Sequence, residues 1–380
     1  MAEYLTNTAD LTAVANAIRE KGGTSEQLAC PDGFVSAIQA IQTGVPLQIA
    51  VTTNAGATVT ATKGSKTVSG TADTSGNCTL TVDEAGTWTV TAATASTTKT
   101  SDVVVGISNV ELVLADSVLN NNSWETIKKV SDAGQGENYW SVGDRKAVTL
   151  NGTVGHLTLS NYTTYAFIIG FNHNASVEGA NRIHFQLAKT ALSGGTDVCF
   201  CDNKYGPDSG WSRPGAGYFV MNASNTNSGG WESSQMRRSI CGTNLSNYSG
   251  TIIAVIPAAL RAVLKTVTKY TDNLGGGSYP SVSNITATTD YFFLLSEYEV
   301  FGSIARANTN EKNKQAQYAY YSAGNSKIKY KHNGTTTAAF WWLRSPDASV
   351  SSFFVFVSTN GGVNVNNAGY SIGFAPGFCI

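Results

Sequence analysis

Apolar residues recur with helical spacing in the first 44 residues of the chain. Asp10 is placed to cap a helix that ends at Gly22 and Gly23, and one face of this helix carries Leu11, Val14, Ala15 and Ile18. Pro31 opens a second short helix, which carries Phe34, Ile38 and Ile41. Because two such helices bury little apolar surface alone, residues 1–44 are predicted to form a small helical module that docks or oligomerises.

Between residues 46 and 106 the pattern changes to strict alternation, as in Thr87-Trp88-Thr89-Val90-Thr91. Turn signals at residues 54–56, 63–65 and 75–77 divide the alternating runs, at about the spacing expected of a small β-sandwich. The pattern predicts an all-β, immunoglobulin-like spacer. Trp88 could offer a platform for a sugar, but its place in an alternating strand favours a core position.

Residues 117–380 mix helical and strand-like patterns. Ser123 is placed to cap a helix carrying Trp124, Ile127 and Val130, and residues 257–267 place Leu260, Val263 and Leu264 on one helical face. Apolar runs at residues 165–171, 183–187 and 291–295 are typical of strands. The sequence therefore predicts an α+β domain in this part of the chain.

Charge does not favour nucleic acid or an anionic membrane as a partner. The chain has 25 Lys and Arg residues against 26 Asp and Glu residues, and 13% of its residues are charged. Its first residues, MAEYLTNTAD, lack the features of a secretory signal, and no apolar stretch is long enough to cross a bilayer. We expect synthesis in a cytoplasm without membrane insertion.

The search for catalytic or metal-binding motifs gives weak candidates. The chain has four histidines, which are isolated in the sequence: His156, His173, His184 and His332. Its six cysteines are scattered, and we interpret most of them as small buried hydrophobic residues; they are Cys30, Cys78, Cys199, Cys201, Cys241 and Cys379. The pair Cys199 and Cys201 would share one side of a strand, which alone is weak support for metal or redox chemistry. Without a nucleophile elbow, phosphate loop or dinucleotide fingerprint, we predict no cofactor and no metal.

A pair of carboxylates could still hydrolyse glycans, because the fold sets such pairs and the sequence hides them. Glu232, Glu297 and Glu299 are candidates. Their apolar surroundings favour a structural interpretation, in which these acids are buried and pair with Arg237 or Arg344.

The C-terminal segment changes character at residue 347. Residues 340–346, FWWLRSP, are typical of a buried strand ended by proline, whereas residues 347–380 contain no Lys, Arg, Glu, Gln, His, Met or Trp. One interpretation is a β-hairpin region with a tight turn at residues 360–362. The other is a ligand-contacting surface, because Ser, Gly, Asn and Tyr with a few exposed aromatics are the residues of antibody paratopes. The composition of residues 347–380 is also what mutagenesis directed at the adenines of Asn codons would leave.

Several motifs occur in order that resemble the variable proteins of diversity-generating retroelements in bacterial viruses. They are residues 123–127 (SWETI), 229–232 (GGWE) with 236–237 (MR), 294–297 (LLSE) with 300–302 (VFG), 341–346 (WWLRSP) and 373–380 (GFAPGFCI). The resemblance covers residues 117–380 and implies a C-type-lectin-like fold. It implies a receptor-binding protein of a phage tail, in which a constant frame displays hypervariable side chains toward the host.

On that pattern the variable region spans about residues 347–372. The implied ligand-binding positions are Asp347, Ser349, Val350, Ser352, Phe353, Phe356, Ser358, Asn360, Gly362, Asn364, Val365, Asn366, Asn367, Tyr370 and Ile372. The implied frame positions are Trp341, Trp342, Arg344, Phe354, Gly373, Pro376, Gly377 and Phe378. The alternation of side chains along a strand agrees with these assignments only in part. Phe354 is a frame position and Phe356 a ligand-binding position, yet both would lie on the same face of a regular strand. The assignments therefore require a β-bulge at this point, or one of them is different.

The resemblance implies a non-enzymatic adhesin of the virion whose partners are a bacterial cell-surface protein or polysaccharide and other phage tail proteins. A homo-oligomer such as a trimer would add avidity. Asp347 is the only acidic residue among residues 347–380, so we expect no calcium site there. The related formylglycine-generating enzymes need a pair of reactive cysteines that these residues lack, so their activity is not expected. Two alternatives stay open: a glycan-degrading tail enzyme using Glu232 or Glu297, and a virion decoration protein without a specific ligand.

Overall fold

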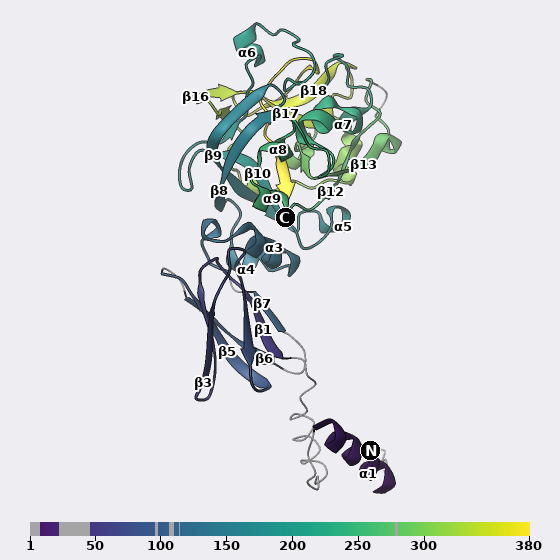
Figure 1. Ribbon diagram of the computed structural model, residues 1–380. Helices are drawn as coiled ribbons and strands as arrows, with labels where there is room; N and C mark the ends of the chain where they lie inside the picture. The colour runs from purple at the N-terminus through teal and green to yellow at the C-terminus, as the bar shows by residue number, and fades with distance from the viewer. Residues whose placement is uncertain (1–7, 23–45, 96–97, 106–109, 114, 278–279) are drawn as a thin grey trace. The chain divides into compact units, whose positions relative to one another are not determined.

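The computed structural model describes residues 8–22, 46–95, 98–105, 110–113, 115–277 and 280–380 (Figure 1). The chain divides into two compact units, Met1–Asp116 and Ser117–Ile380. Helices and mainly antiparallel sheets both occur, so the α+β class predicted from the sequence is confirmed. Among the described helices, none has the length and apolar character that crossing a membrane requires.

The first unit begins with α1 (Thr8–Gly22), whose end at Gly22 agrees with the sequence prediction. The predicted cap at Asp10 is wrong, because the helix begins at Thr8 and Asp10 lies inside its first turn. Ala15 and Ile18 are buried as predicted, but Val14 is 48% exposed. The predicted second helix, residues 31–41, and Cys30 lie outside the described residues.

Two sheets follow α1. One has the order β4-β1-β7 and the other the order β3-β2-β5-β6. Their bounds are β1 (Leu47–Thr52), β2 (Thr58–Lys63), β3 (Lys66–Thr71), β4 (Asn77–Val82), β5 (Gly86–Ala93), β6 (Thr98–Val105) and β7 (Val110–Val113). Alternate residues of both sheets, such as Ile49, Leu80, Val59 and Val90, form one buried core. Trp88 is fully buried in this core, which confirms the core interpretation.

The second unit is built around a five-stranded sheet of order β14-β20-β10-β9-β8. Its strands are β8 (Arg145–Val154), β9 (Leu157–Phe171), β10 (Ile183–Lys189), β14 (Phe292–Phe293) and β20 (Gly377–Cys379). The last strand therefore lies inside the sheet, between β14 and β10. Residues 371–380 are all buried, so the end of the variable segment is fixed inside the unit.

Three smaller sheets complete the second unit. They have the orders β11-β15-β16, β12-β13 and β17-β18-β19. Their bounds are β11 (Val198–Cys199), β12 (Val267–Asp272), β13 (Ile285–Asp290), β15 (Lys329–Lys331), β16 (Gly334–Ala339), β17 (Trp341–Pro346), β18 (Phe353–Val357) and β19 (Val363–Asn367). The third of these sheets carries most of the predicted variable region.

Short helices connect the sheets. They are α3 (Trp124–Asp132), α4 (Gly136–Tyr139), α5 (Ala175–Glu178), α6 (Gly206–Ser209), α7 (Gly230–Ser233), α8 (Ile252–Val255), α9 (Ala258–Arg261), α10 (Glu297–Phe301), α11 (Ala319–Ser322), the π-helix η2 (Met236–Cys241), and the 3-10 helices η1 (Leu119–Asn121), η3 (Val282–Asn284) and η4 (Thr309–Asn313). The hydroxyl of Ser123 accepts a hydrogen bond from the backbone N–H of Thr126 and caps α3, as predicted.

Two elements predicted in this unit are shorter in the structure than the sequence indicated. The predicted helix over residues 257–267 is reduced to α9, because Lys265 pairs through its backbone with Cys379 and the β-branched residues Thr266, Val267 and Thr268 lead into β12. The predicted strand over residues 291–295 is reduced to β14, after which the chain turns toward α10.

Candidate functional site

The sheet β17-β18-β19 has one buried edge strand, β17, and one accessible edge strand, β19. Every residue of β17 is buried, and residues 354–357 of β18 are buried as well. In contrast, β19 contains exposed and half-exposed residues throughout. Accessible side chains therefore come from β19, from the start of β18 and from the loops at residues 348–352, 358–362 and 370.

Most of the ligand-binding positions implied by the resemblance retain accessible atoms. We call this set the variable face; it consists of Ser349, Val350, Ser352, Phe353, Ser358, Asn360, Gly362, Asn364, Val365, Asn366, Asn367 and Tyr370. No residue of the set carries a formal charge. All of the implied frame positions are buried.

Three implied ligand-binding positions are corrected, because their side chains are buried. Phe356 is 4% exposed: β18 is the central strand and is covered on both sides, and the Phe356 ring packs edge-on against Phe340 and Trp342, at centroid distances of 5.3 and 6.2 Å. Ile372 is fully buried in the segment that leads into β20. Asp347 is 5% exposed, and its Oδ1 accepts hydrogen bonds from the backbone N–H groups of Ser349 and Val350.

Asn227, which lies outside the variable region, fixes the backbone of the loop at residues 347–353. Its Nδ2 donates to the carbonyl oxygens of Asp347 (3.0 Å), Val350 (3.0 Å) and Phe353 (2.8 Å). Its backbone N–H donates to the carbonyl of Ser351 at 2.7 Å. These bonds end on backbone atoms, so apart from the Asp347 cap the loop conformation depends little on which side chains it displays.

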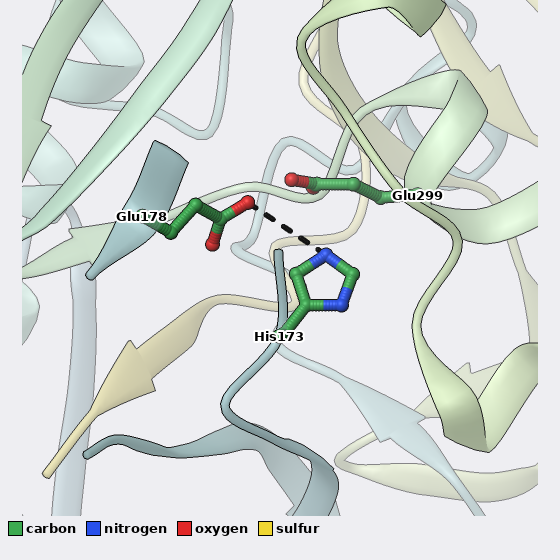
Figure 2. A group of neighbouring side chains, drawn as sticks. All are labelled: His173, Glu178 and Glu299. Carbon is green, nitrogen blue, oxygen red and sulfur yellow. Dashed lines mark ion pairs between the residues drawn. The ribbon is translucent and has the colours of Figure 1, made fainter. Parts of the chain in front are cut away.

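A second group of interest is a buried ionic cluster formed by His173, Glu178, Lys269, Glu299 and Arg344. All five side chains are at most 7% exposed. Figure 2 shows the carboxylates of Glu178 and Glu299 pointing toward the His173 imidazole. The residues come from the loop before α5, from α5, β12, α10 and β17, so the cluster joins elements that are distant in sequence.

Lys269 and Arg344 neutralise the two carboxylates. Lys269 Nζ donates to Glu178 Oε2 at 2.6 Å, to Glu299 Oε1 at 2.9 Å and to the Tyr318 hydroxyl at 2.8 Å. Arg344 makes a two-pronged contact with the Glu299 carboxylate. Burial raises the pKa of Glu299, but the charges of Arg344 and Lys269 outweigh it and hold this pKa well below its usual value. Burial raises the pKa of Glu178 to about 7 against the opposing effect of Lys269.

Ligand atoms of His173, Glu178 and Glu299 lie within 4.8 Å of one another, a spacing that a metal ion could use. Lys269 already bridges the two carboxylates, so a divalent cation would have to displace an ammonium group and face Arg344. Burial, with the nearby charge of Lys269, lowers the pKa of His173 to about 3, so this imidazole is neutral. The arrangement fits a structural ion network better than a metal centre.

The acids proposed for glycan hydrolysis do not converge on a site. Glu232 is exposed. Glu297 is buried, and its carboxylate accepts hydrogen bonds from the backbone N–H groups of residues 305–307. The predicted pairing with arginine is confirmed for Glu299 and wrong for the other two, because Arg237 pairs instead with Asp290.

The sulfur atoms of Cys199 and Cys201 lie 4.0 Å apart, on the same side as predicted, but the strand β11 ends at Cys199 and does not include Cys201. Both are free and buried. The Nδ1 atom of His332 accepts a hydrogen bond from the backbone N–H of Cys201 at 3.1 Å, so it is engaged in holding this strand. Cys78, Cys241 and Cys379 are also free and buried, in agreement with their predicted role as small core residues.

Sequence comparison adds a partial family match. The family described as "Domain of unknown function (DUF6273)" matches residues 218–380, a stretch that includes Asn227, the β17-β18-β19 sheet and β20. No curated protein matches the chain. The C-terminal part of the second unit is thus similar to a recurrent domain to which its description assigns no function.

Proposed function

We propose that the chain is a hypervariable receptor-binding protein of a phage tail, which recognises a bacterial cell-surface protein or polysaccharide through its variable face. Residues 117–380 form a C-type-lectin-like recognition domain. Residues 46–106 form an immunoglobulin-like spacer, and residues 1–44 attach the protein to the tail or to other copies of itself. The protein acts as an adhesin and not as an enzyme.

The observation that carries this proposal is how the loop at residues 347–353 is held. Asn227 binds its backbone carbonyl groups, and Asn227 itself lies outside the segment whose composition indicates diversification. A receptor-binding surface that changes by mutation needs this separation, because side chains can be exchanged only if they do not determine the fold.

The chemistry of the variable face also supports recognition. Its side chains are short or aromatic, so they lose little conformational entropy when a ligand orders them. Phe353 and Tyr370 are half-exposed and supply aromatic contact area, while the asparagine side chains supply hydrogen-bond donors and acceptors. A neutral surface of this kind is suited to ligands recognised by shape and hydrogen bonding.

The arrangement of the second unit supports a lectin-like frame. Its first long strands, β8 and β9, and its last strand, β20, belong to one sheet, and part of the segment between them forms the separate β17-β18-β19 sheet. The variable segment is therefore attached at both ends to buried strands, β17 and β20.

Adhesion to host bacteria tests the proposal directly. The full chain, fluorescently labelled, is compared with a variant in which Val350, Asn360 and Asn364 are changed to Ser, Tyr and Asp. We expect the variant to lose adhesion to the original host while its melting temperature is unchanged. The matched control changes Thr335, Thr336 and Thr337, exposed residues of β16, and should keep adhesion.

Equal adhesion of all three proteins would refute the variable face as the receptor site. The flanking DNA offers an independent test of diversification. We expect a near-copy of the segment that encodes residues 347–372, differing at adenines, next to a reverse transcriptase gene.

A further inference from the structure

Trp211 differs from the other tryptophans of the chain. All seven tryptophans lie in the described residues, and six of them are buried, whereas Trp211 is half-exposed. Its backbone has a φ of +59°, in the left-handed region that bulky residues rarely adopt. Because such strain concentrates at functional sites, an accessible tryptophan held in this way points to a ligand.

The indole of Trp211 is fixed in place by its surroundings. The Trp211 backbone N–H donates to the carbonyl of Gly206 at 2.8 Å. The ring packs directly on the Gly206 backbone, since a Cβ atom at Gly206 would lie 2.6 Å from Cε3 of the indole. Any residue larger than glycine at position 206 would therefore push the ring away, so this glycine positions the tryptophan.

Two further half-exposed aromatic rings lie against Trp211. The ring centroid of Tyr370 is 5.4 Å away at an interplanar angle of 54°, and that of Phe340 is 5.7 Å away at 45°. We call Trp211, Phe340 and Tyr370 the aromatic shelf. Phe340 packs in turn against buried Phe356, which ties the shelf to the core of the β17-β18-β19 sheet.

Amide groups lie beside the shelf. Asn225 Nδ2 donates to Asn367 Oδ1 at 3.1 Å, and Asn225 Oδ1 accepts a hydrogen bond from the backbone N–H of Gly369, the residue before Tyr370. Both asparagine side chains are half-exposed, so each keeps atoms available to solvent. The exposed acid nearest in sequence to Trp211, Asp208, is already paired with Lys331.

We propose that the aromatic shelf is a subsite for a neutral pyranose unit of a host-surface polysaccharide. This inference rests on the proposed function and names a ligand class for one part of the same face. The C–H face of a pyranose ring stacks on flat aromatic rings, and its hydroxyl groups bond to amides such as those of Asn225 and Asn367.

The division between constant and variable residues favours a saccharide over a protein. Trp211 and Phe340 lie outside residues 347–372, whereas Tyr370 lies inside. A constant contact is useful only for a feature that many receptors share. Pyranose rings recur throughout bacterial surface polysaccharides, whereas protein surfaces differ from one another. The constant rings thus bind the recurring unit, and position 370 adjusts the selectivity.

Tryptophan fluorescence provides a specific test, because acrylamide in water reaches Trp211 far more readily than the six buried indoles. The full chain is titrated with acrylamide alone and in the presence of cellohexaose, maltohexaose or chitohexaose at millimolar concentration. We expect at least one of these neutral sugars to protect the quenchable fraction. If none of them protects Trp211, the inference is wrong.

Variants separate stacking from general damage to the fold. Trp211→Asn removes the ring and keeps a residue that tolerates a positive φ, so the variant should fold and should bind the protecting sugar about tenfold more weakly or worse, by calorimetry. Leu192→Ala is the matched control, because it removes an apolar side chain that is 45% exposed and lies outside both the variable face and the shelf, and it should bind the sugar normally. Unchanged sugar affinity of Trp211→Asn would overturn the inference.

The two proposals fail in distinguishable ways. If changes at Val350, Asn360 and Asn364 abolish host adhesion while no sugar protects Trp211, the variable face is the receptor site and the saccharide subsite is refuted. If a sugar protects Trp211 while those changes leave adhesion intact, the subsite stands and the variable face is refuted.

Discussion

The side-chain amide of Asn227 donates a hydrogen bond to the backbone carbonyl of Val350, with 3.0 Å between Nδ2 and the oxygen. Val350 is 39% exposed, whereas Asn227 is fully buried. A buried residue outside residues 347–372 thus holds an exposed residue of the variable face by its backbone. This relationship allows the side chain at position 350 to change while the loop keeps its conformation.

The change Asn227→Ala should therefore destabilise the second unit. It removes three hydrogen bonds to the loop at residues 347–353, and we expect the free energy of unfolding to fall by about 2–4 kcal/mol. Denaturant unfolding measures the loss. The matched control, Asn364→Ala, alters an exposed residue and should change the free energy by no more than about 0.5 kcal/mol. Equal effects of the two changes would contradict the anchoring role.

Two phenylalanines of β18 should respond differently to truncation. Phe356 is buried against Phe340 and Trp342, so Phe356→Ala should cost about 3–5 kcal/mol of unfolding free energy. Phe353 is half-exposed, so Phe353→Ala should cost less than about 1.5 kcal/mol. Thermal unfolding of both variants measures the difference. A larger loss for Phe353→Ala would show that the assignment of frame and variable positions is reversed.

The buried ionic cluster should be sensitive to loss of one partner. Glu299→Gln removes the carboxylate that pairs with both Lys269 and Arg344, and we expect a loss of about 3–5 kcal/mol. Denaturant unfolding at neutral pH measures it. The control is Asp208→Asn, which breaks the partly exposed pair with Lys331 and should cost about 1 kcal/mol or less. Near-equal losses would argue against the cluster as a clamp between α5, β12, α10 and β17.

Acid should destabilise the second unit through its buried histidines. Burial lowers the pKa of His332 to about 4, with a smaller contribution from Lys331, whereas the unfolded chain titrates near 6.5. Between these values the unfolded state binds more protons, so the free energy of unfolding falls as the pH falls below about 6.5. The variant His332→Asn keeps an acceptor for the Cys201 N–H and cannot titrate.

The free energy of unfolding should fall from pH 7 to pH 5 in both proteins. We expect this fall to be about 1–2 kcal/mol smaller in His332→Asn than in the unmodified chain. Unfolding curves recorded at both pH values provide the comparison. Thr336→Asn, at an exposed residue of β16, serves as the control for the introduced asparagine and should follow the unmodified chain at both pH values. The same pH dependence in all three proteins would mean that His332 is not held neutral by the fold.

Local patterns predicted part of this architecture well. The cap at Ser123, the buried strand β17 and the pairing of Arg344 with a glutamate each depend on a few neighbouring residues or on a strong composition signal. The alternating pattern around Trp88 likewise identified a core strand. Such features could be read from the sequence because the deciding interactions are short in range or follow from hydrophobicity.

Features that depend on distant contacts could not be predicted. The resemblance implies a ligand-binding position at Phe356, and strand alternation, which puts Phe356 on the same face as Phe354, does not reveal that β18 is covered on both sides. Lys269 is a lone cation in a strand, and its partners Glu178 and Glu299 come from separate helices. Asn227 lies just before the motif at residues 229–232 and is not part of it, and its role follows only from where the loop at residues 347–353 lies.

We propose that a constant frame holds side chains that can be exchanged without unfolding the protein. The most direct measurement is the thermal stability of a library in which Ser349, Val350, Asn360, Asn364 and Asn366 are randomised together in the full chain. We predict that most members fold and melt within a few degrees of the original protein, as surface substitutions allow. A parallel library randomised at the buried residues Trp341, Trp342 and Phe354 is the control, and most of its members should fail to fold. If most members of the first library also fail to fold, the separation of frame and variable face is contradicted.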